Sequence, residues 1–376
     1  MKHYKLSDIV IEINERENDP SSSKYDRFVG LEHYVSGDVI IRNYGSTELL
    51  GSSMKVFRAG DVLVARRNVY LKRAATVDFD GLTSGDSIVL RAKSELFGKI
   101  LPFILNTDEF WDYADKYSDG TMSKRLSPKV LMQYEFDLPD DDKLIQLVDI
   151  LWASNEAKES YRKLLHATDD LVKSQFIEMF GVLESNTKNY PVRNLSEIAS
   201  FWNGLTYKPA DATQDGTGTL VLRSSNIQNG TLAFDDNVRV NCPIKEKLFV
   251  QDNDILMCSR NGSAALVGKT ALIKNLQEPM TFGAFMMIIR SDYYAFLKTF
   301  FEMSAFRSQI STGTSTINQI TGNMLRQVKI PVPDIDTVRS FERFVEQSDK
   351  SKFELKKAIE NINKLMKSLM QQDFNG

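Results

Sequence analysis

An internal duplication constrains the fold of this chain more than any other feature of its 376 residues. The motif Leu6-Ser-Asp-Ile9 returns as Leu195-Ser-Glu-Ile198, 189 residues further along. Residues 61–68 (DVLVARRN) return as residues 254–261 (DILMCSRN), with an offset of 193. A repeat over this distance predicts two copies of one structural unit, each with its own hydrophobic core.

Further blocks recur in the same order. The turn at residues 35–37 has a looser echo at residues 227–229, and Gly120-Thr121 returns 193 residues later as a second Gly-Thr pair. From Pro139 the offset is 194 to the end of the chain. Five blocks in one order, with an offset that drifts by only five residues, indicate duplication rather than chance.

Each copy has the same internal plan. Short apolar runs rich in Val, Ile and Phe, bounded by Gly, Asn and Asp, are typical of β-strands. Two shorter segments with helical spacing interrupt them, at residues 97–117 and 293–310. The clearest strand-like runs are residues 61–65, 87–90, 255–258 and 286–289.

After Pro139 and again after Pro333, the apolar period changes to that of a long helix. Each segment runs for about 40 residues without Gly or Pro, which predicts a rod about 60 Å long. Asp residues directly after each Pro suit the positive end of a helix dipole. The apolar residues that share the a and d positions of one heptad frame are Leu144, Leu147, Leu151, Tyr161, Leu165 and Val172 in the first helix, and Val338, Phe341, Val345, Leu355, Ile359, Ile362, Met366 and Leu369 in the second.

Polar residues interrupt this heptad seam at matched places. Ser154 and Lys158 occupy frame positions in the first helix, and Ser348 and Lys352 occupy them in the second. Two interpretations fit these residues. Either they fix the register of a coiled coil, or the middle of each helix is simply solvated.

Composition excludes several classes of protein. The net charge of −3 gives no overall attraction for a polyanion, so local patches such as residues 55–73, with six basic residues and one acid, would have to meet it. Cys242, Cys258 and three scattered His provide no zinc ligand set or disulfide scaffold. Because the sequence has no signal-peptide pattern and no stretch of 18 apolar residues, we expect a cytoplasmic protein.

Motifs that suggest an enzyme fail on spacing. Residues 262–270 (GSAALVGKT) are similar to a phosphate-binding loop, but the loop is one residue too long and a strand-like run follows Lys269. The acidic residues near Asp140 and Glu156 mimic a nuclease signature, but they are spread along a helix and cannot share one metal ion. We therefore predict no catalytic residues, and expect His166 to be structural or exposed.

Turns that contain Arg and Asn are the remaining candidates for function. Residues 66–68 (Arg-Arg-Asn) follow a strand-like run in the first copy, and residues 259–261 (Ser-Arg-Asn) follow the matching run in the second. Arg and Asn pair bidentately with guanine and adenine edges in the major groove of DNA. A plain surface turn, whose Asn adopts a left-handed backbone, explains the pattern equally well.

The segments after each Gly-Thr pair add hydroxyl, amide and basic groups, which suit contacts to phosphates and to bases. The predicted DNA contacts are all polar or basic and are Arg66, Arg67, Asn68, Lys72, Arg73, Lys124 and Arg125 in the first copy, and Arg223, Ser225, Asn226, Ser259, Arg260, Asn261, Thr314, Thr316, Asn318 and Gln319 in the second.

The order of these blocks resembles the specificity subunits of type I restriction–modification enzymes. The resemblance rests on LSDI and LSEI at the start of the copies, GDVLVARRN and NDILMCSRN in their middles, GTMSKRL and GTSTINQI before the exit, and IPVPDID with its counterpart FDLPDDD. It extends over essentially the whole chain. Each motif alone is degenerate, whereas their order and duplication are specific.

This resemblance implies an α+β fold with two tandem target-recognition domains, each β-rich with short helices and each followed by a long α-helix. The helices are expected to pack as an antiparallel coiled coil with pseudo-two-fold symmetry. The expected boundaries are residues 1–138 for recognition domain 1, 139–181 for spacer helix 1, 182–332 for recognition domain 2 and 333–376 for spacer helix 2.

The resemblance also implies a function. Each recognition domain would read one half of an asymmetric, bipartite target in double-stranded DNA, while the helices set the spacing. Two modification subunits, which use S-adenosylmethionine to methylate adenine, would dock on the helices, and restriction subunits that use ATP and Mg would join them. The chain itself is expected to have no cofactor, no metal, no membrane contact and no catalytic activity.

Two other functions remain as alternatives. In the first, the chain would be a coiled-coil scaffold that assembles proteins without touching nucleic acid. In the second, the chain itself would be a nuclease or a methyltransferase. A steep dependence of DNA binding on salt separates a DNA reader from a pure scaffold.

Overall fold

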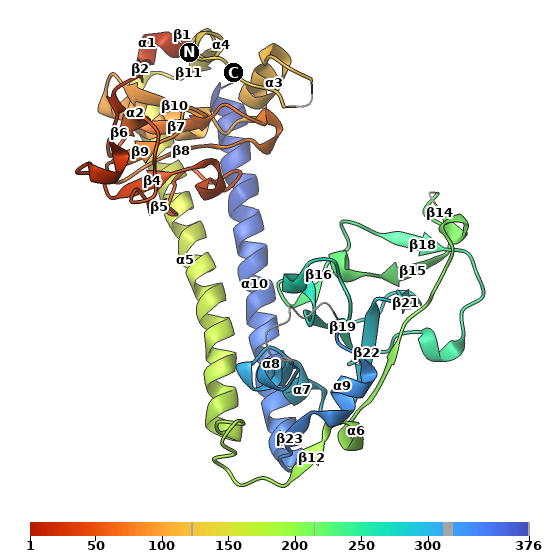
Figure 1. Ribbon diagram of the computed structural model, residues 1–376. Coiled ribbons are helices and arrows are strands. Elements are labelled where there is room, and N and C mark those ends of the chain that lie inside the picture. The colour runs from red at the N-terminus through yellow and green to blue at the C-terminus, as the bar shows by residue number, and fades with distance from the viewer. Residues whose placement is uncertain (122, 214, 311–318, 375–376) are drawn as a thin grey trace. The chain divides into compact units, whose positions relative to one another are not determined.

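The computed structural model describes residues 1–121, 123–213, 215–310 and 319–374 (Figure 1). The chain forms two compact units, one made of Met1–Arg162 with Lys356–Gly376 and the other of Lys163–Leu355. The first unit therefore combines two segments that are far apart in the sequence, whereas the second is one continuous stretch. Within the described residues, none of the helices combines the length and apolar character that a membrane crossing requires.

The first unit is built around a four-stranded sheet with the order β2-β10-β7-β8. A five-stranded sheet in the order β3-β6-β9-β4-β5 and the antiparallel pair β1 and β11 complete its β-structure. The strands are β1 (Lys2–Lys5), β2 (Val10–Ile13), β3 (Arg16–Glu17), β4 (Arg27–Val29), β5 (Gly45–Ser46), β6 (Met54–Phe57), β7 (Val62–Ala65), β8 (Ala74–Thr76), β9 (Gly81–Thr83), β10 (Ser87–Ala92) and β11 (Glu135–Leu138). The short helices are α1 (Leu6–Ile9), α2 (Glu95–Ile104), α3 (Asp108–Tyr117), α4 (Pro128–Leu131) and the 3-10 turns η1 (Pro20–Ser22), η2 (Leu31–His33) and η3 (Val69–Leu71).

The second unit repeats this plan with the four-stranded sheet β13-β22-β19-β20 and the pair β12 and β23. A second four-stranded sheet, β14-β18-β15-β21, and the hairpin β16-β17 accompany them. The strands are β12 (Val192–Asn194), β13 (Ser200–Asn203), β14 (Ala212–Thr213), β15 (Thr219–Leu222), β16 (Ile227–Gln228), β17 (Thr231–Leu232), β18 (Val238–Val240), β19 (Ile255–Cys258), β20 (Thr270–Leu272), β21 (Met280–Phe282), β22 (Met286–Arg290) and β23 (Lys329–Pro331). The short helices are α6 (Leu195–Ile198), α7 (Tyr294–Phe301), α8 (Ser304–Ile310), α9 (Gly322–Gln327) and the 3-10 turns η4 (Pro209–Asp211), η5 (Ser224–Asn226), η6 (Glu246–Leu248) and η7 (Ala264–Leu266).

The central strands are apolar at every position because both faces of their sheets are covered. In β7, Val62 and Val64 belong to one core, and Leu63 and Ala65 belong to another on the opposite face. Strand β19 is divided between two cores in the same way. Side chains alternate between the two faces of a strand, so a run without polar residues is expected where neither face meets water.

The duplication holds at the level of single hydrogen-bonded pairs. Strand β7 pairs with β10 so that Ala65 faces Ser87, and β19 pairs with β22 so that Cys258 faces Met286. The offset between the copies is therefore 193 in the first strand of each pair and 199 in the second. The second copy has three additional residues between β19 and β20 and three more between β20 and β22, and a later deletion offsets them, so constant-offset matching does not align this region.

A matched ion pair crosses each of these sheets. Arg91 on β10 donates two hydrogen bonds to the buried carboxylate of Asp61, at 2.7 and 2.8 Å. Arg290 on β22 does the same to Asp254, at 2.6 and 2.7 Å. A buried carboxylate needs such a bidentate partner, so the pair fixes how the two strands align in both copies.

Two long helices follow the globular parts, α5 (Asp141–Phe180) and α10 (Ile335–Phe374). In the first unit, Met366 of α10 joins the same core as Leu147 and Leu151 of α5. In the second unit, Phe176 near the end of α5 lies 5.5 Å from Phe341 near the start of α10, measured between ring centroids. The beginning of each helix thus lies beside the end of the other, and the helices run antiparallel.

These features confirm the expected fold, two β-rich copies each followed by a long helix that packs against its partner. The boundaries inferred from the sequence stay a prediction, because the compact units group the chain by packing and divide each long helix between them. The Asp residue that directly follows Pro333 caps α10, as its position in the sequence indicates. Asp334 accepts a hydrogen bond from the backbone N–H of Thr337 at 2.8 Å.

The polar seam residues are not simply solvated. Lys158 is 3% exposed and Ser348 is 7% exposed, while Lys352 lies 3.1 Å from Asp169 and 3.2 Å from Asp349. Lys158 is directed to the globular part of its own copy, where the Asp38 carboxylate lies 3.8 Å from its Nζ. A role in coiled-coil register stays a prediction.

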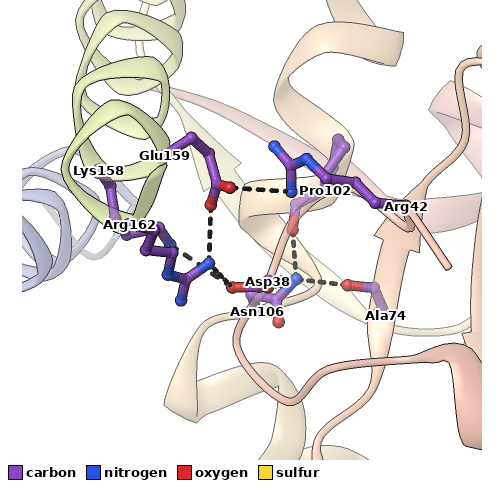
Figure 2. A network of polar contacts seen from close by, with 8 residues as sticks. All are labelled: Asp38, Arg42, Ala74, Pro102, Asn106, Lys158, Glu159 and Arg162. Carbon is purple, nitrogen blue, oxygen red and sulfur yellow. Dashed lines mark hydrogen bonds and ion pairs between the residues drawn. The ribbon is translucent and has the colours of Figure 1, made fainter. Parts of the chain in front are cut away.

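Lys158 belongs to a network of charges that attaches α5 to the first globular copy (Figure 2). Arg162 donates to Asp38 at 2.8 Å and to Glu159 at 2.7 Å, and Arg42 lies 3.5 Å from Glu159. Nearby, Asn106 donates to the carbonyls of Ala74 and Pro102, which ties the end of α2 to β8. Asp38 is the carboxylate on which both Lys158 and Arg162 converge.

Replacement of Asp38 by Ala should destabilise the first unit by about 3 kcal/mol at neutral pH, because it leaves buried Lys158 without its counter-ion. Burial lowers the pKa of Lys158, and Asp38 opposes that shift. Since the folded state disfavours the charged lysine, the loss should shrink as pH rises towards 10.5, where the amine becomes neutral. Urea unfolding of the full chain at two pH values measures it.

The matched control is Asp170→Ala, which removes an exposed carboxylate 3.7 Å from Lys173 on the same helix. Such surface pairs contribute about 0–1 kcal/mol, so this variant should unfold close to wild type. Equal effects of the two substitutions would contradict the role assigned to Asp38.

Candidate nucleic-acid interface

The predicted Arg-Asn turn of the first copy lies directly after β7. Arg66 donates from Nε to the carbonyl of Leu126 at 3.2 Å, and the Arg67 side chain is exposed. Asn68 adopts a left-handed backbone with φ of 55°, and its Oδ1 accepts from the hydroxyl of Ser123 at 2.9 Å. The turn interpretation thus holds for the backbone of Asn68, whereas Arg67 remains available at the surface.

The segment after each Gly-Thr pair lies beside this turn. Arg67 forms a β-bridge with Arg125 in the first copy, and Arg260 forms one with Gln319 in the second. The residue after each bridge also bonds to the turn. Leu126 N–H donates to the carbonyl of Arg66 at 2.8 Å, and Ile320 N–H donates to the carbonyl of Ser259 at 2.7 Å. The structure therefore brings together two predicted segments that lie about 60 residues apart in each copy.

Carboxylates already neutralise much of the basic patch at residues 55–73. Lys55 is 5% exposed and lies 3.7 Å from Glu12, so it is a core residue. Lys72 donates to Asp108 at 2.9 Å, and both Nη atoms of Arg73 donate to backbone carbonyls. Lys124, outside the patch, donates to Asp115 at 2.6 Å. The charge count of this region therefore overstates the field that it presents to a polyanion.

Arg67 and Arg125 converge on one carboxylate. Arg67 lies 3.5 Å from Asp86, and Arg125 donates to the other oxygen of the same side chain. Asp86 follows β9 and immediately precedes β10, and its backbone carbonyl accepts from Arg66 N–H at 2.9 Å. The first copy thus presents two guanidinium groups held over one acid.

The second copy presents a groove. Its walls are the segment after β13, the turn η5 after β15, the turn after β19 and the connection between β21 and β22. Four predicted contacts, Arg223, Ser225, Arg260 and Asn261, line it. The other lining residues are Leu205, Thr206, Tyr207, Pro209, Ser224, Asp236, Gly262, Gly283, Ala284, Phe285 and Met286.

Local geometry explains how this groove forms. A side chain at Gly204 would place its Cβ 2.1 Å from the carbonyl oxygen of Phe282, so only glycine lets residues 205–207 approach the opposite wall. Asn261 donates to Ser224 at 3.1 Å and joins two of the walls. Arg223 donates to Asp236 at 2.8 Å. Within the described residues, the buried Oγ of Ser225 and Nε of Arg223 have no hydrogen-bond partner.

Two predicted contacts are wrong as direct contacts. Asn226 is 0% exposed, and its side chain bonds to the backbone of Arg223 and Ala233 inside its own loop. Ser259 is 2% exposed and donates to the carbonyl of Phe285 at 2.8 Å. The polar groups of both side chains are occupied by hydrogen bonds to the backbone near the groove. Thr314, Thr316 and Asn318 lie outside the described residues, and Gln319 is exposed beside Arg260.

Sequence reasoning missed three residues of these sites: Asp86, Tyr207 and Phe285. Asp86 and Phe285 lie in the region where the offset between copies rises to 199, so constant-offset matching could not pair them. An exposed Phe between two apolar strands carries no separate signal in the sequence. Tyr207 follows a segment with no close match in the first copy.

The enzyme-like motifs are resolved as ordinary structure. Residues 262–270 form the turn η7 and the start of β20, which pairs antiparallel with β19, so the strand interpretation is confirmed and no helix follows Lys269. Among the residues that the structure covers, no group of three or more His, Cys, Asp or Glu is placed to hold a metal ion.

Comparison with known proteins agrees with this architecture. Residues 187–364 match the family model of the type I restriction modification DNA specificity domain. The specificity subunit of the type I restriction enzyme EcoKI from Escherichia coli (strain K12) is 28% identical over 158 residues, which are 39% of this chain and 33% of that protein. The family match assigns residues 187–364, just under half of the chain, to the type I restriction modification DNA specificity domain.

Two solved structures of type I restriction–modification proteins share this fold over nearly the whole chain. The crystal structure of a type I restriction–modification S subunit from M. genitalium has a TM-score of 0.57 and 14% identity, and the match covers 99% of this chain and 96% of that one. A chain from a structure of complex assembly and conformational transition of the type I R-M system has a TM-score of 0.51 and 19% identity, over 99% and 97% of the two chains. At these identities the likeness shows the fold alone. The sequence match to EcoKI spans about one third of that relative's length.

One carboxylate links the first copy's candidate interface to α10. Asp108, at the start of α3, accepts from Lys72 through one oxygen at 2.9 Å and from Lys367 of α10 through the other at 2.6 Å. The hydrogen bond from Lys367, followed by that from Lys72, lowers the pKa of Asp108 to about 2. Lys72 is therefore held against the globular surface.

Carboxyl NMR titration of the full chain should show Asp108 with a pKa of about 2, below the ordinary 3.8. A depressed carboxyl pKa means that the ion pairs stabilise the fold above pH 3.8 and lose their effect as pH falls through 2. Lys367→Met should raise the pKa of Asp108, while the control Lys364→Met, at an exposed position on the same helix, should leave it unchanged. An Asp108 pKa near 3.8 in the wild-type chain would contradict this arrangement.

Proposed function

We propose that this chain recognises a specific double-stranded DNA sequence for a type I restriction–modification complex, with one half of the target read by each globular copy. The observation that carries the proposal is the repeated pairing of an Arg-containing turn with the segment after a Gly-Thr pair, in Arg67 with Arg125 and in Arg260 with Gln319. Each pairing brings together side chains of the types that bind base edges.

The chemistry of these sites suits DNA. Arg pairs bidentately with the O6 and N7 atoms of guanine, and Asn and Gln pair with adenine. The groove of the second copy adds Arg223, Ser225 and Asn261 to Arg260, and two of its buried polar atoms have no partner among the described residues.

The two copies differ at nearly every one of these surface positions. The first presents guanidinium groups bound to carboxylates, and the second presents a groove with Ser, Asn and aromatic side chains. We infer an asymmetric, bipartite target, because two readers with unlike side chains select unlike base sequences. The proposed reading residues are Arg66, Arg67, Asn68, Lys72, Arg73, Lys124 and Arg125 in the first copy, and Arg223, Ser225, Arg260, Asn261, Thr314, Thr316, Asn318 and Gln319 in the second.

The long helices fit a spacer role in this proposal. In this proposal, residues 139–181 and 333–376 are the spacer helices, and residues 1–138 and 182–332 are the recognition domains. Two modification subunits that use S-adenosylmethionine would dock on the helices, and restriction subunits that use ATP and Mg would complete the complex. In this proposal those partners modify or cleave the DNA, and this chain recognises the target sequence.

Binding of the assembled complex to duplex DNA should fall steeply as salt rises, because Lys and Arg that contact phosphates release counterions. A linear fit of log affinity against log salt gives the number of phosphate contacts, with a slope of about −0.9 for each. A protein scaffold that does not touch DNA would show no such slope.

Substitution of the reading arginines should affect one half of the target at a time. Arg67→Ala should relax selection in one half and Arg260→Ala in the other, each by about 1–3 kcal/mol, because each removes a donor pair to one base. Competition binding with single-base variants of the target measures this. Arg16→Ala on β3 and Arg193→Ala on β12, both exposed and outside the sites, are matched controls.

If Arg67→Ala or Arg260→Ala weakens binding to every sequence equally, the residue is a phosphate anchor and not a reader. If neither substitution changes affinity or selectivity, the sites described above are not the interface.

A further inference from the structure

Asp86 and Phe285 occupy the same structural position in the two copies. Each residue immediately precedes the strand that pairs with the central strand, β10 or β22. The backbone carbonyl of Asp86 accepts from Arg66 N–H at 2.9 Å, and that of Phe285 accepts from Ser259 N–H at 2.9 Å. Arg66 and Ser259 are themselves matched positions, so the equivalence follows from hydrogen bonding and not from sequence similarity.

The backbone at this position is held the same way in both copies, while the side chains differ completely. Phe285 O accepts two further hydrogen bonds, from Arg260 N–H at 3.0 Å and Ser259 Oγ at 2.8 Å. Because these bonds involve only backbone atoms of residues 86 and 285, a change of side chain there leaves the sheet intact. The position is free to vary without cost to the scaffold.

In the first copy the side chain at this position is an anchor for arginine. Asp86 lies 3.5 Å from Arg67 and also binds Arg125. Its side chain is 24% exposed, whereas those of Arg67 and Arg125 are 51% and 47% exposed. The carboxylate thus lies below two guanidinium groups and occupies part of each donor fork.

In the second copy the matching side chain, Phe285, is an aromatic ring over which Arg260 stacks. The guanidinium carbon of Arg260 lies 5.5 Å from the centre of the Phe285 ring, and Phe285 is 61% exposed at the edge of the groove. Among the described residues, no carboxylate lies within ion-pair distance of Arg260. Its donor fork is oriented by a cation–π contact, and within the part of the chain that the structure describes its side-chain N–H groups have no acceptor, so they are open to a ligand.

We propose that the residue at position 86 in the first copy and 285 in the second determines specificity by setting how the neighbouring arginine reads its base. This inference rests on the proposed function and deepens it. With Phe285 beneath it, Arg260 offers a complete fork to the O6 and N7 atoms of guanine. With Asp86 beneath them, Arg67 and Arg125 are held in a fixed orientation, and the pair carries one positive charge less.

Asp86 and Phe285 are therefore positioning residues that act through arginine. Since the carboxylate withdraws donors from Arg67, the first copy should discriminate through orientation of the arginine pair. Loss of the Asp86 charge should free both guanidinium groups for phosphates, which raises affinity for all sequences while selectivity in that half falls.

The test is selection from a duplex library with both half-sites randomised, using the full chain assembled with its modification subunits. Asp86→Asn should lower discrimination at one base pair of the first half by about 5- to 150-fold, and should steepen the salt dependence of non-specific binding by about one phosphate contact. Asp86→Glu, which keeps the carboxylate, should restore most of the discrimination.

The second copy gives the reciprocal arm of the same experiment. Phe285→Ala should lower preference for guanine at one position of the other half by a similar factor, and Phe285→Trp should retain it. Phe285→Asp should bind Arg260 as Asp86 binds Arg67, and so change the preferred base at that position. The matched controls are Asp26→Asn and Phe234→Ala, at exposed residues outside the two sites.

The outcomes separate this inference from the proposed function. If the wild-type complex selects no split sequence, the proposed function fails. If it selects one, and Asp86→Asn and Phe285→Ala leave both halves unchanged, the function stands and the role of this position is overturned. Relaxation of both halves by either single substitution would also overturn it, because that result indicates a general structural effect.

Discussion

The burial of aromatic and aliphatic side chains between α5 and α10 is the interaction on which the rest of this structure depends. Each globular copy carries the first turns of its own helix, but its core also takes side chains from the helix of the other copy. Met366 of α10 is buried in the first unit, and Phe176 and Phe180 of α5 are fully buried in the second. Each compact unit therefore closes its core with side chains of both long helices.

The two copies share their buried ion pairs and strand register, but they differ at nearby positions that face outward. The ion pairs Asp61–Arg91 and Asp254–Arg290 have nearly identical geometry, and the strands around them keep the same register. A few residues away, the positions that face outward share little, with Asp86 in one copy and Phe285 in the other. A rigid sheet whose alignment is fixed by a buried ion pair tolerates free substitution at its rim.

Much of this organisation is predictable from the sequence, because hydrophobic periodicity and repetition are strong signals. The strands at residues 61–65 and 255–258 and the two long helices all follow from them. The contacts that individual side chains make cannot be predicted from these signals. Nothing in the sequence indicates that Lys55 is buried, that Asp108 joins Lys72 to Lys367, or that Asn226 is consumed by its own loop, since these depend on contacts between distant segments. The insertions between β19 and β22, which raise the offset from 193 to 199, hid the equivalence of Asp86 and Phe285.

The most direct test of the split-reader account is the methylome of cells that express this chain with its modification subunit, sequenced before and after residues 1–138 are exchanged for the matching domain of another family member. The account predicts methylated adenines within two defined half-sites separated by a gap of fixed length. The exchange should replace one half-site and keep the other half-site and the gap. An unchanged methylation pattern, or a change in both halves together, would contradict it.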